Sequence, residues 1–277
     1  MNHNDVNTKR LVASRVRGHF PWSALVLLLF LAVFLMPQQA SSFVCSRVTD
    51  ADGNDAGPSL SWFERHITYT IFHKGTEQIR SDIAFLLLDQ SFVPWRDAIE
   101  CVSPGRSTNL SFERHPTTSD VDRIGYDYLH PSDNENLFIF RDGDWPFPGQ
   151  SSVIALTTVT FKPQTGEILD ADIEFNSKNF RFSADATGIP TEMDLMNTAV
   201  HEIGHFLGLA HVNHSDATMH ASAQLGETKK RHLSCDDKNG MVFKYPVGEP
   251  NGYCDPPVAS CGFCAKPEEL TNTPVVT

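Results

Sequence analysis

Three histidines and one glutamate stand at spacings that suit a metal-dependent hydrolase. His201 and His205 lie four residues apart, so both imidazoles would project from one face of an α-helix and could share a metal ion. Glu202 would lie about 100° around the helix from His201, too displaced to be a ligand but close enough to reach a water at the metal. Gly208 can adopt a left-handed conformation and turn the chain, so that His211 returns as a third ligand. Three neutral imidazoles with one open position indicate a catalytic zinc site, because structural sites close all four positions.

Chance is a poor explanation for this pattern. Its five fixed residues, from His201 to His211, recur by accident in on the order of one sequence in ten thousand. We therefore prefer a metal site to histidines that merely fall on a core helix. His214 is a competing third nitrogen, but the turn at Gly208 favours His211.

The extended pattern, followed by Met219 within residues 215–220, resembles the metzincin signature. Residues 233–241 and Tyr245 also resemble the C-terminal helix of matrixins, the matrix-metalloprotease clan and its bacterial relatives (peptidase M10). The resemblance covers roughly residues 62–246. It implies an α+β catalytic domain: a twisted, mainly parallel five-stranded sheet with an antiparallel edge strand, an active-site helix and a C-terminal helix.

The same resemblance assigns roles to individual residues. His201, His205 and His211 would bind one catalytic Zn²⁺, and Glu202 would be the general base of a zinc metalloendopeptidase. Met219 would form an apolar floor beneath the metal. Asp236 would accept hydrogen bonds from the region behind the site.

Residues 142–149 are similar to the matrixin loop that cradles structural zinc and calcium. The histidines expected around this loop in the vertebrate enzymes are missing, so we expect no second zinc. Carboxylates suit harder cations, which leaves Ca²⁺ as a candidate at Asp142 or Asp144. The alternative is a solvated acidic turn.

β-branched and aromatic runs predict the strands that must carry this helix. Expected strands are 66–72, 110–113, 136–140, 153–161 and 168–175, with a helix at 81–99 that Pro94 interrupts. In metzincins the strand matching 153–161 lines the cleft, antiparallel to bound peptide. An unpaired edge can bind an extended chain through its main chain. The acids of 168–175 alternate onto one face, which we expect to face solvent.

The ends of the chain differ in composition from its middle. Residues 1–42 combine a basic region, an apolar run too short for a comfortable membrane span, and small residues, as in a signal peptide. An uncleaved anchor is the alternative. We divide the rest into an extended lead-in (43–61), the catalytic domain (62–246) and a cysteine-containing tail (247–277). The predicted location is secreted, extracellular or periplasmic.

The acidic net charge of the chain limits the classes of molecule that it is expected to bind. The chain has 22 basic and 34 acidic side chains, and loss of 1–42 would leave 18 and 33. Such an acidic protein is a poor match for nucleic acid or anionic lipid. We expect a monomer that acts on protein or peptide substrates and does not associate stably with membranes after signal cleavage.

Six cysteines follow the signal segment, and an exported chain would pair them as disulfides, with fifteen connectivities open. A metal knuckle at Cys254, Cys261 and Cys264, or a Cys45 thiolate on the zinc, are alternatives. Three other functions also stay open: a zinc hydrolase of peptidoglycan or another non-protein substrate, a non-catalytic zinc-binding module, and a disulfide-stapled structural protein.

Overall fold

The computed structural model describes residues 43–50, 52, 54–101, 103–116, 119–120, 122–254 and 275–276. The predicted signal segment and the pair Cys261 and Cys264 lie outside the described residues. The strands are β1 (Val44–Cys45), β2 (His66–Ile71), β3 (Ser111–Arg114), β4 (Leu137–Phe140), β5 (Ala155–Phe161), β6 (Ile168–Phe175), β7 (Phe182–Ser183), β8 (Met193–Asp194), β9 (Leu209–Ala210) and β10 (Val275–Val276). The helices are α2 (Ser81–Ser91), α3 (Val93–Arg96), α4 (Leu195–Phe206) and α5 (Cys235–Lys244), with 3₁₀ turns η1 (Pro131–Asp133) and η2 (Lys229–Arg231). Within the described ranges, no helix is both long enough and apolar enough to cross a bilayer.

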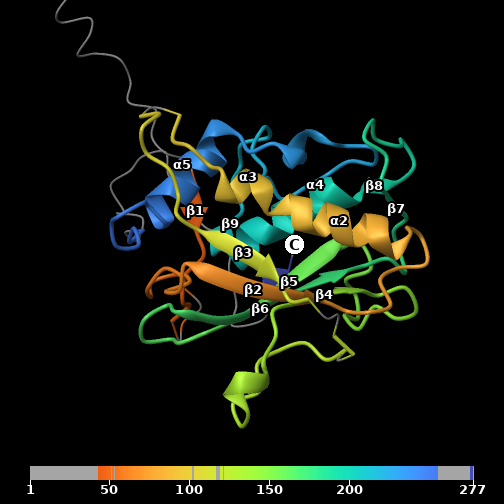
Figure 1. The fold of residues 1–277 in the computed structure, drawn as a ribbon, viewed down its shortest axis with the longest axis horizontal. Helices are drawn as coiled ribbons and strands as arrows, with labels where there is room; N and C mark the ends of the chain where they lie inside the picture. Colours follow the sequence, from red (N-terminus) through yellow and green to blue (C-terminus); the bar gives the residue numbers. More distant parts are fainter. Residues whose placement is uncertain are drawn as a thin grey trace, which may run out of the picture. The chain divides into compact units, whose positions relative to one another are not determined.

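The main sheet has the strand order β10-β5-β6-β4-β2-β3, and Figure 1 labels its strands β2 to β6. Strands β2, β3, β4 and β6 run parallel to one another, whereas β5 runs antiparallel to β6. The five expected strands are therefore present, mainly parallel and with an antiparallel strand beside them, which confirms the predicted α+β fold. The sequence does not predict β10, which pairs antiparallel with the outer side of β5.

Helices α2 and α4 pack against each other on one side of the sheet, and α4 contacts both β5 and β6 (Figure 1). The helix expected at 81–99 is divided as Pro94 suggested: α2 ends at Ser91, and Pro94 lies in the first turn of α3. The indole N–H of the fully buried Trp95 donates to the carbonyl of Val200 at 2.9 Å. This bond ties α3 to the helix that carries the histidines.

The lead-in, residues 43–61, packs against the rest of the domain. β1 pairs antiparallel with β9, directly after the end of the histidine helix, and Leu60 is buried in the core. Disulfides join Cys45 to Cys254 and Cys101 to Cys235. Because Cys45 and Cys254 are bonded to each other, neither is a thiolate ligand.

One expectation about β6 is wrong. Asp170, Asp172 and Glu174 do share a face, but all three are buried instead of facing solvent. The connection from β3 to β4 crosses this face, opposite the helices (Figure 1), and Asp172 accepts hydrogen bonds from the amides of Gly125 and Leu137 at 2.6 and 2.8 Å. Arg141 pairs with Glu174 at 2.6 Å. Alternation along a strand shows which residues share a face, but not whether a distant loop covers that face.

The buried acids make stability depend on pH. Burial raises the pKa of Asp170 to about 8 and also raises that of Asp172. A carboxyl group with a raised pKa stabilises the fold while it is protonated, and this contribution is lost as pH rises from about 4 to about 8.

We expect Asp170→Asn to flatten this pH dependence, because an amide does not ionise between about pH 4 and about pH 8, and its N–H can take the place of the protonated carboxyl that is hydrogen-bonded to Asp172. At pH 8 the variant should be more stable than the parent by about 1.4 kcal/mol or more, the equivalent of one pKa unit. Urea unfolding between pH 5 and pH 8 measures the difference, with the exposed Asp144→Asn as control. Equal pH profiles for the parent and Asp170→Asn would contradict this assignment.

Candidate metal centre

Helix α4 begins after a capping aspartate and ends just before a glycine, as its sequence predicts. The Asp194 side chain accepts from the Asn197 amide at 2.7 Å and caps the helix, and Arg231 pairs with the same carboxylate. The helix ends at Phe206, and Gly208 follows in the left-handed region with φ +80°. A Cβ on Gly208 would overlap the carbonyl oxygen of Leu60.

The turn at Gly208 brings His211 back to the helix. Its Nε2 lies 3.2 Å from Nε2 of His201 and 3.1 Å from Nε2 of His205. Within the described part of the chain, these three histidines form the one group of three or more His, Cys, Asp or Glu residues whose ligand atoms converge on a point. The sequence-predicted ligand set is therefore brought together.

The rings are held with their Nε2 atoms pointing inward. Nδ1 of His201 lies 2.6 Å from the carbonyl of Thr218, and Nδ1 of His205 lies 2.8 Å from that of Leu209. A carbonyl accepts only, so each Nδ1 carries the proton and each Nε2 presents a lone pair. Burial lowers the pKa of all three imidazoles, that of His211 to about 4.

This donor set fits zinc. Lone pairs directed at one point repel each other unless a cation lies between them. Two nitrogens about 2.0–2.1 Å from a tetrahedral zinc ion are about 3.3 Å apart, close to the spacings seen here. Three nitrogen donors also leave one of four positions for water or substrate, as the sequence predicts.

Glu202 lies beside the histidines and is 2% exposed. The hydroxyl of Thr157, on β5, lies 2.6 Å from Oε2 of Glu202 and donates to it. This contact ties the carboxylate to the sheet, so β5 and α4 together fix its position. Sequence reasoning missed Thr157, because a threonine in a β-branched strand carries no local signal of a partner 45 residues away.

Met219 is 2% exposed and packs against the helix at Gly204, where a Cβ would overlap its sulfur. Met219 is therefore a buried apolar contact of the helix that carries the histidines, and its role as a floor beneath a metal ion stays a prediction. Gly204 carries the signal that could have found this contact, since a glycine inside a helix costs about 1 kcal/mol and needs a packing reason.

The carboxylate behind Met219 is Asp237 rather than the expected Asp236. Asp237 is 1% exposed and accepts from the amides of Thr218 and Met219 at 2.7 and 3.1 Å. Ser234 caps α5 in a capping box that points Asp237 inward, while Asp236 is partly exposed. The spacing from Ser234 to Asp237 is the local signal that could have chosen between the adjacent acids, because a capping box needs its acid three residues after the cap.

The remaining candidate ligands lie elsewhere. His214 is exposed, and Nδ1 of His220 lies beside Ser222 rather than in the cluster. Asp142 accepts from the Thr76 hydroxyl at 2.8 Å and from the Glu77 amide at 2.7 Å, and Asp144 lies 3.6 Å from the ammonium of Lys178. The protein itself supplies partners for both carboxylates considered for calcium.

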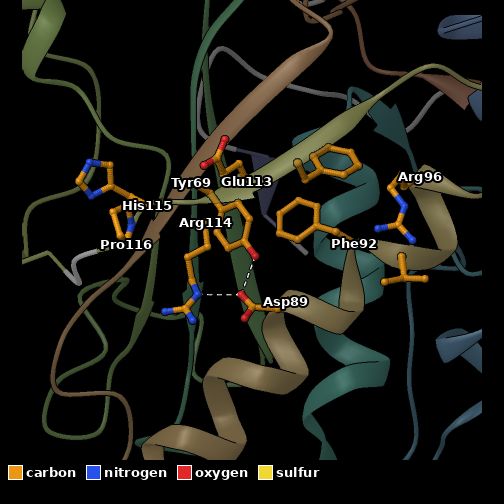
Figure 2. A pocket seen from close by; sticks show the side chains of 10 residues that line it. Tyr69, Asp89, Phe92, Arg96, Glu113, Arg114, His115 and Pro116 are labelled. Carbon is orange, nitrogen blue, oxygen red and sulfur yellow. Dashed lines mark hydrogen bonds and ion pairs between the residues drawn. The ribbon is translucent and has the colours of Figure 1, made fainter.

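A surface pocket of about 350 Å³ lies between β2, β3 and α2 (Figure 2). Three of its polar side chains bind one another: Asp89 accepts from the hydroxyl of Tyr69 at 2.6 Å and pairs with Arg114 at 2.9 Å (Figure 2). None of the converging histidines lines it. This pocket is therefore separate from the candidate metal centre.

Replacing Gly208 with alanine should disturb both the fold and the metal centre. The added Cβ would meet the Leu60 carbonyl in a backbone conformation that side chains rarely adopt, so we expect a loss of about 1–3 kcal/mol. The displaced turn should also move His211 and weaken zinc binding. Thermal unfolding and zinc titration measure the two effects, with Gly143→Ala, where no atom lies within 4 Å of the added Cβ, as control. Unchanged zinc affinity in Gly208→Ala would contradict the role given to this turn.

Sequence comparisons place the same segment in a known family. The Matrixin family model matches residues 61–245, which include strands β2 to β6 and the histidine centre.

Three curated relatives are similar to the chain. Metalloendoproteinase 5-MMP of Arabidopsis thaliana is 38% identical over 112 residues, 40% of this chain and 29% of the relative. Metalloendoproteinase 2-MMP of the same plant is 29% identical over 200 residues, 70% of this chain and 44% of the relative. Macrophage metalloelastase of Rattus norvegicus is 25% identical over 212 residues, 74% of this chain and 38% of the relative. The matches thus span less than half the length of each relative.

Proposed function

The chain belongs to the matrixin family of metzincin metalloproteases, and on that premise we propose that it is a secreted zinc-dependent endopeptidase of protein or peptide substrates. The observation that carries the proposal is the convergence of three imidazole nitrogens, 3.1–3.2 Å apart, beside a buried carboxylate.

His201, His205 and His211 would hold the zinc ion. When bound, zinc supplies a Lewis acid that polarises a carbonyl and lowers the pKa of water towards ~7. Glu202 takes the proton from the water that attacks the scissile carbonyl and delivers it to the leaving amine. The hydroxyl of Thr157 donates to Oε2 of Glu202 at 2.6 Å. This hydrogen bond would hold the carboxylate in position while it takes the proton from water and while it passes the proton to the amine. Met219 would supply the apolar floor beneath the histidines, and its buried contact with the helix at Gly204 supports this role.

Strand β5 would position the substrate. Its residue Thr157 contacts the proposed base, so a peptide paired with the outer edge of β5 would run past Glu202. Main-chain pairing of this kind binds an extended chain largely regardless of its side chains. This supports a protein or peptide substrate.

The location and assembly state also belong to this proposal. The basic and apolar composition of residues 1–42 supports export, and the disulfides at Cys45 and Cys101 suit an oxidising compartment. We propose that the exported protein acts as a monomer without stable membrane association.

Digestion of casein and of peptide libraries, with and without a chelator, tests the proposal. We expect cleavage that the chelator abolishes and added zinc restores. A zinc-loaded protein that cleaves no peptide would instead indicate a binding module, and cleavage confined to peptidoglycan cross-links would indicate the non-protein substrate class.

A further inference from the structure

The outer edge of β5 is occupied by the end of the chain itself. Val275 and Val276 of β10 pair antiparallel with Thr157 and Leu156 of β5. Without β10, β5 would be the edge strand of the sheet, with one row of main-chain donors and acceptors unpaired. The tail therefore covers the part of the sheet that is best suited to bind another extended chain.

This pairing lies next to the candidate catalytic centre. Val275 is opposite Thr157, whose hydroxyl donates to Glu202 at 2.6 Å. A chain paired at this register passes directly beside the strand residue that holds the base. The tail and a peptide substrate would need the same main-chain partners on β5, and only one of them can use these partners at a time.

We propose that the C-terminal residues Val275–Val276 act as a tethered competitor that occupies the substrate edge of β5 and is displaced by peptide substrates. This inference rests on the proposed peptidase function for its kinetic consequence, but not for the pairing itself. Many different peptides should be able to displace the tail, because main-chain pairing recognises extended backbone rather than particular side chains.

The tether accounts for how a two-residue strand can compete. Cys254 is fixed to the domain by its disulfide with Cys45, and the 20 residues 255–274 separate it from β10. Twenty residues can span at most about 70 Å, and tethering through a segment of that length gives an effective concentration on the order of 1 mM. A strand of two residues binds weakly on its own, so we expect it to occupy the outer edge of β5 only part of the time. The tail should therefore raise the apparent KM for a peptide substrate and leave kcat unchanged.

Removal of residues 271–277 tests the proposal. We expect KM for a peptide substrate to fall about two- to tenfold relative to the full chain, with kcat unchanged. This is the effect of losing a tethered competitor whose effective concentration is close to, or a few times above, its dissociation constant for the β5 edge. The excised heptapeptide, added back at millimolar concentration, should inhibit the shortened protein competitively. Equal KM values for the full and shortened chains would overturn the proposal.

Two substitutions separate main-chain pairing from side-chain contacts. Val275→Pro with Val276→Pro removes both amide donors and should reproduce the low KM of the shortened chain. Val275→Thr with Val276→Thr keeps β-branched side chains and both amides, and should behave like the full chain. A low KM in the threonine variant would contradict recognition through the main chain.

Amide hydrogen exchange decides the pairing independently of peptidase activity. Amides of β5 between Leu156 and Thr158 should exchange faster in the shortened chain and in the proline variant than in the full chain. If no form cleaves peptides but these amides still lose protection, the proposed function fails and the tail pairing stands. If protection is the same in all forms, the tail pairing fails whatever the activity.

Discussion

A Glu202→Gln variant is expected to lose between about a hundredfold and ten-thousandfold in kcat/KM while keeping its zinc ion. Glutamine preserves the size of the side chain and can still accept from the Thr157 hydroxyl, which lies 2.6 Å from Oε2 in the parent. It has no basic oxygen to take the proton from water. The loss should therefore appear in kcat, and zinc content should match that of the parent.

Thr157→Val is the graded comparison for this experiment. Valine keeps the β-branched shape in the strand but cannot donate to Glu202. The carboxylate therefore remains, but its position is less restricted. We expect a smaller loss than in Glu202→Gln, of about tenfold and mainly in kcat, since the hydrogen bond only positions the base. Substantial residual turnover by Glu202→Gln would refute Glu202 as the base, whatever Thr157→Val does.

His211→Ala should release the zinc ion and bring peptide cleavage below detection. Two nitrogens remain in this variant, and they cannot replace the ligand that the turn at Gly208 supplies. We expect zinc affinity to fall by more than about 100-fold, the upper range for changes in residues that only support metal ligands. Zinc titration with a competing chelator measures this loss.

His214→Ala is the matched control, because His214 lies three residues further on and is exposed. It should retain both zinc and activity. Loss of zinc in His214→Ala together with retention in His211→Ala would reverse the assignment of the third ligand.

The metal centre could be predicted because its information is local. The spacing of His201 and His205, the glycine that turns the chain, and the return of His211 lie within eleven consecutive residues. Helix periodicity and glycine stereochemistry then determine the geometry. The division of the helix at Pro94 and the hairpin of β5 and β6 follow from equally local rules.

Two features that sequence missed depend on distant contacts. Thr157 and Glu202 are 45 residues apart and meet only because α4 packs on β5. The acids of β6 are buried because the β3–β4 connection crosses them, as the hydrogen bond between Gly125 and Asp172 shows. Hydrophobic pattern and residue type carry no information about these tertiary choices.

The most direct measurement is the zinc content of the purified full chain, followed through chelation and zinc replacement while peptide cleavage is recorded on the same sample. The account predicts one zinc ion per chain, loss of cleavage as the metal is removed, and recovery of both when zinc is restored. Purified protein that holds no transition metal, or cleavage that continues after the metal has gone, would contradict it.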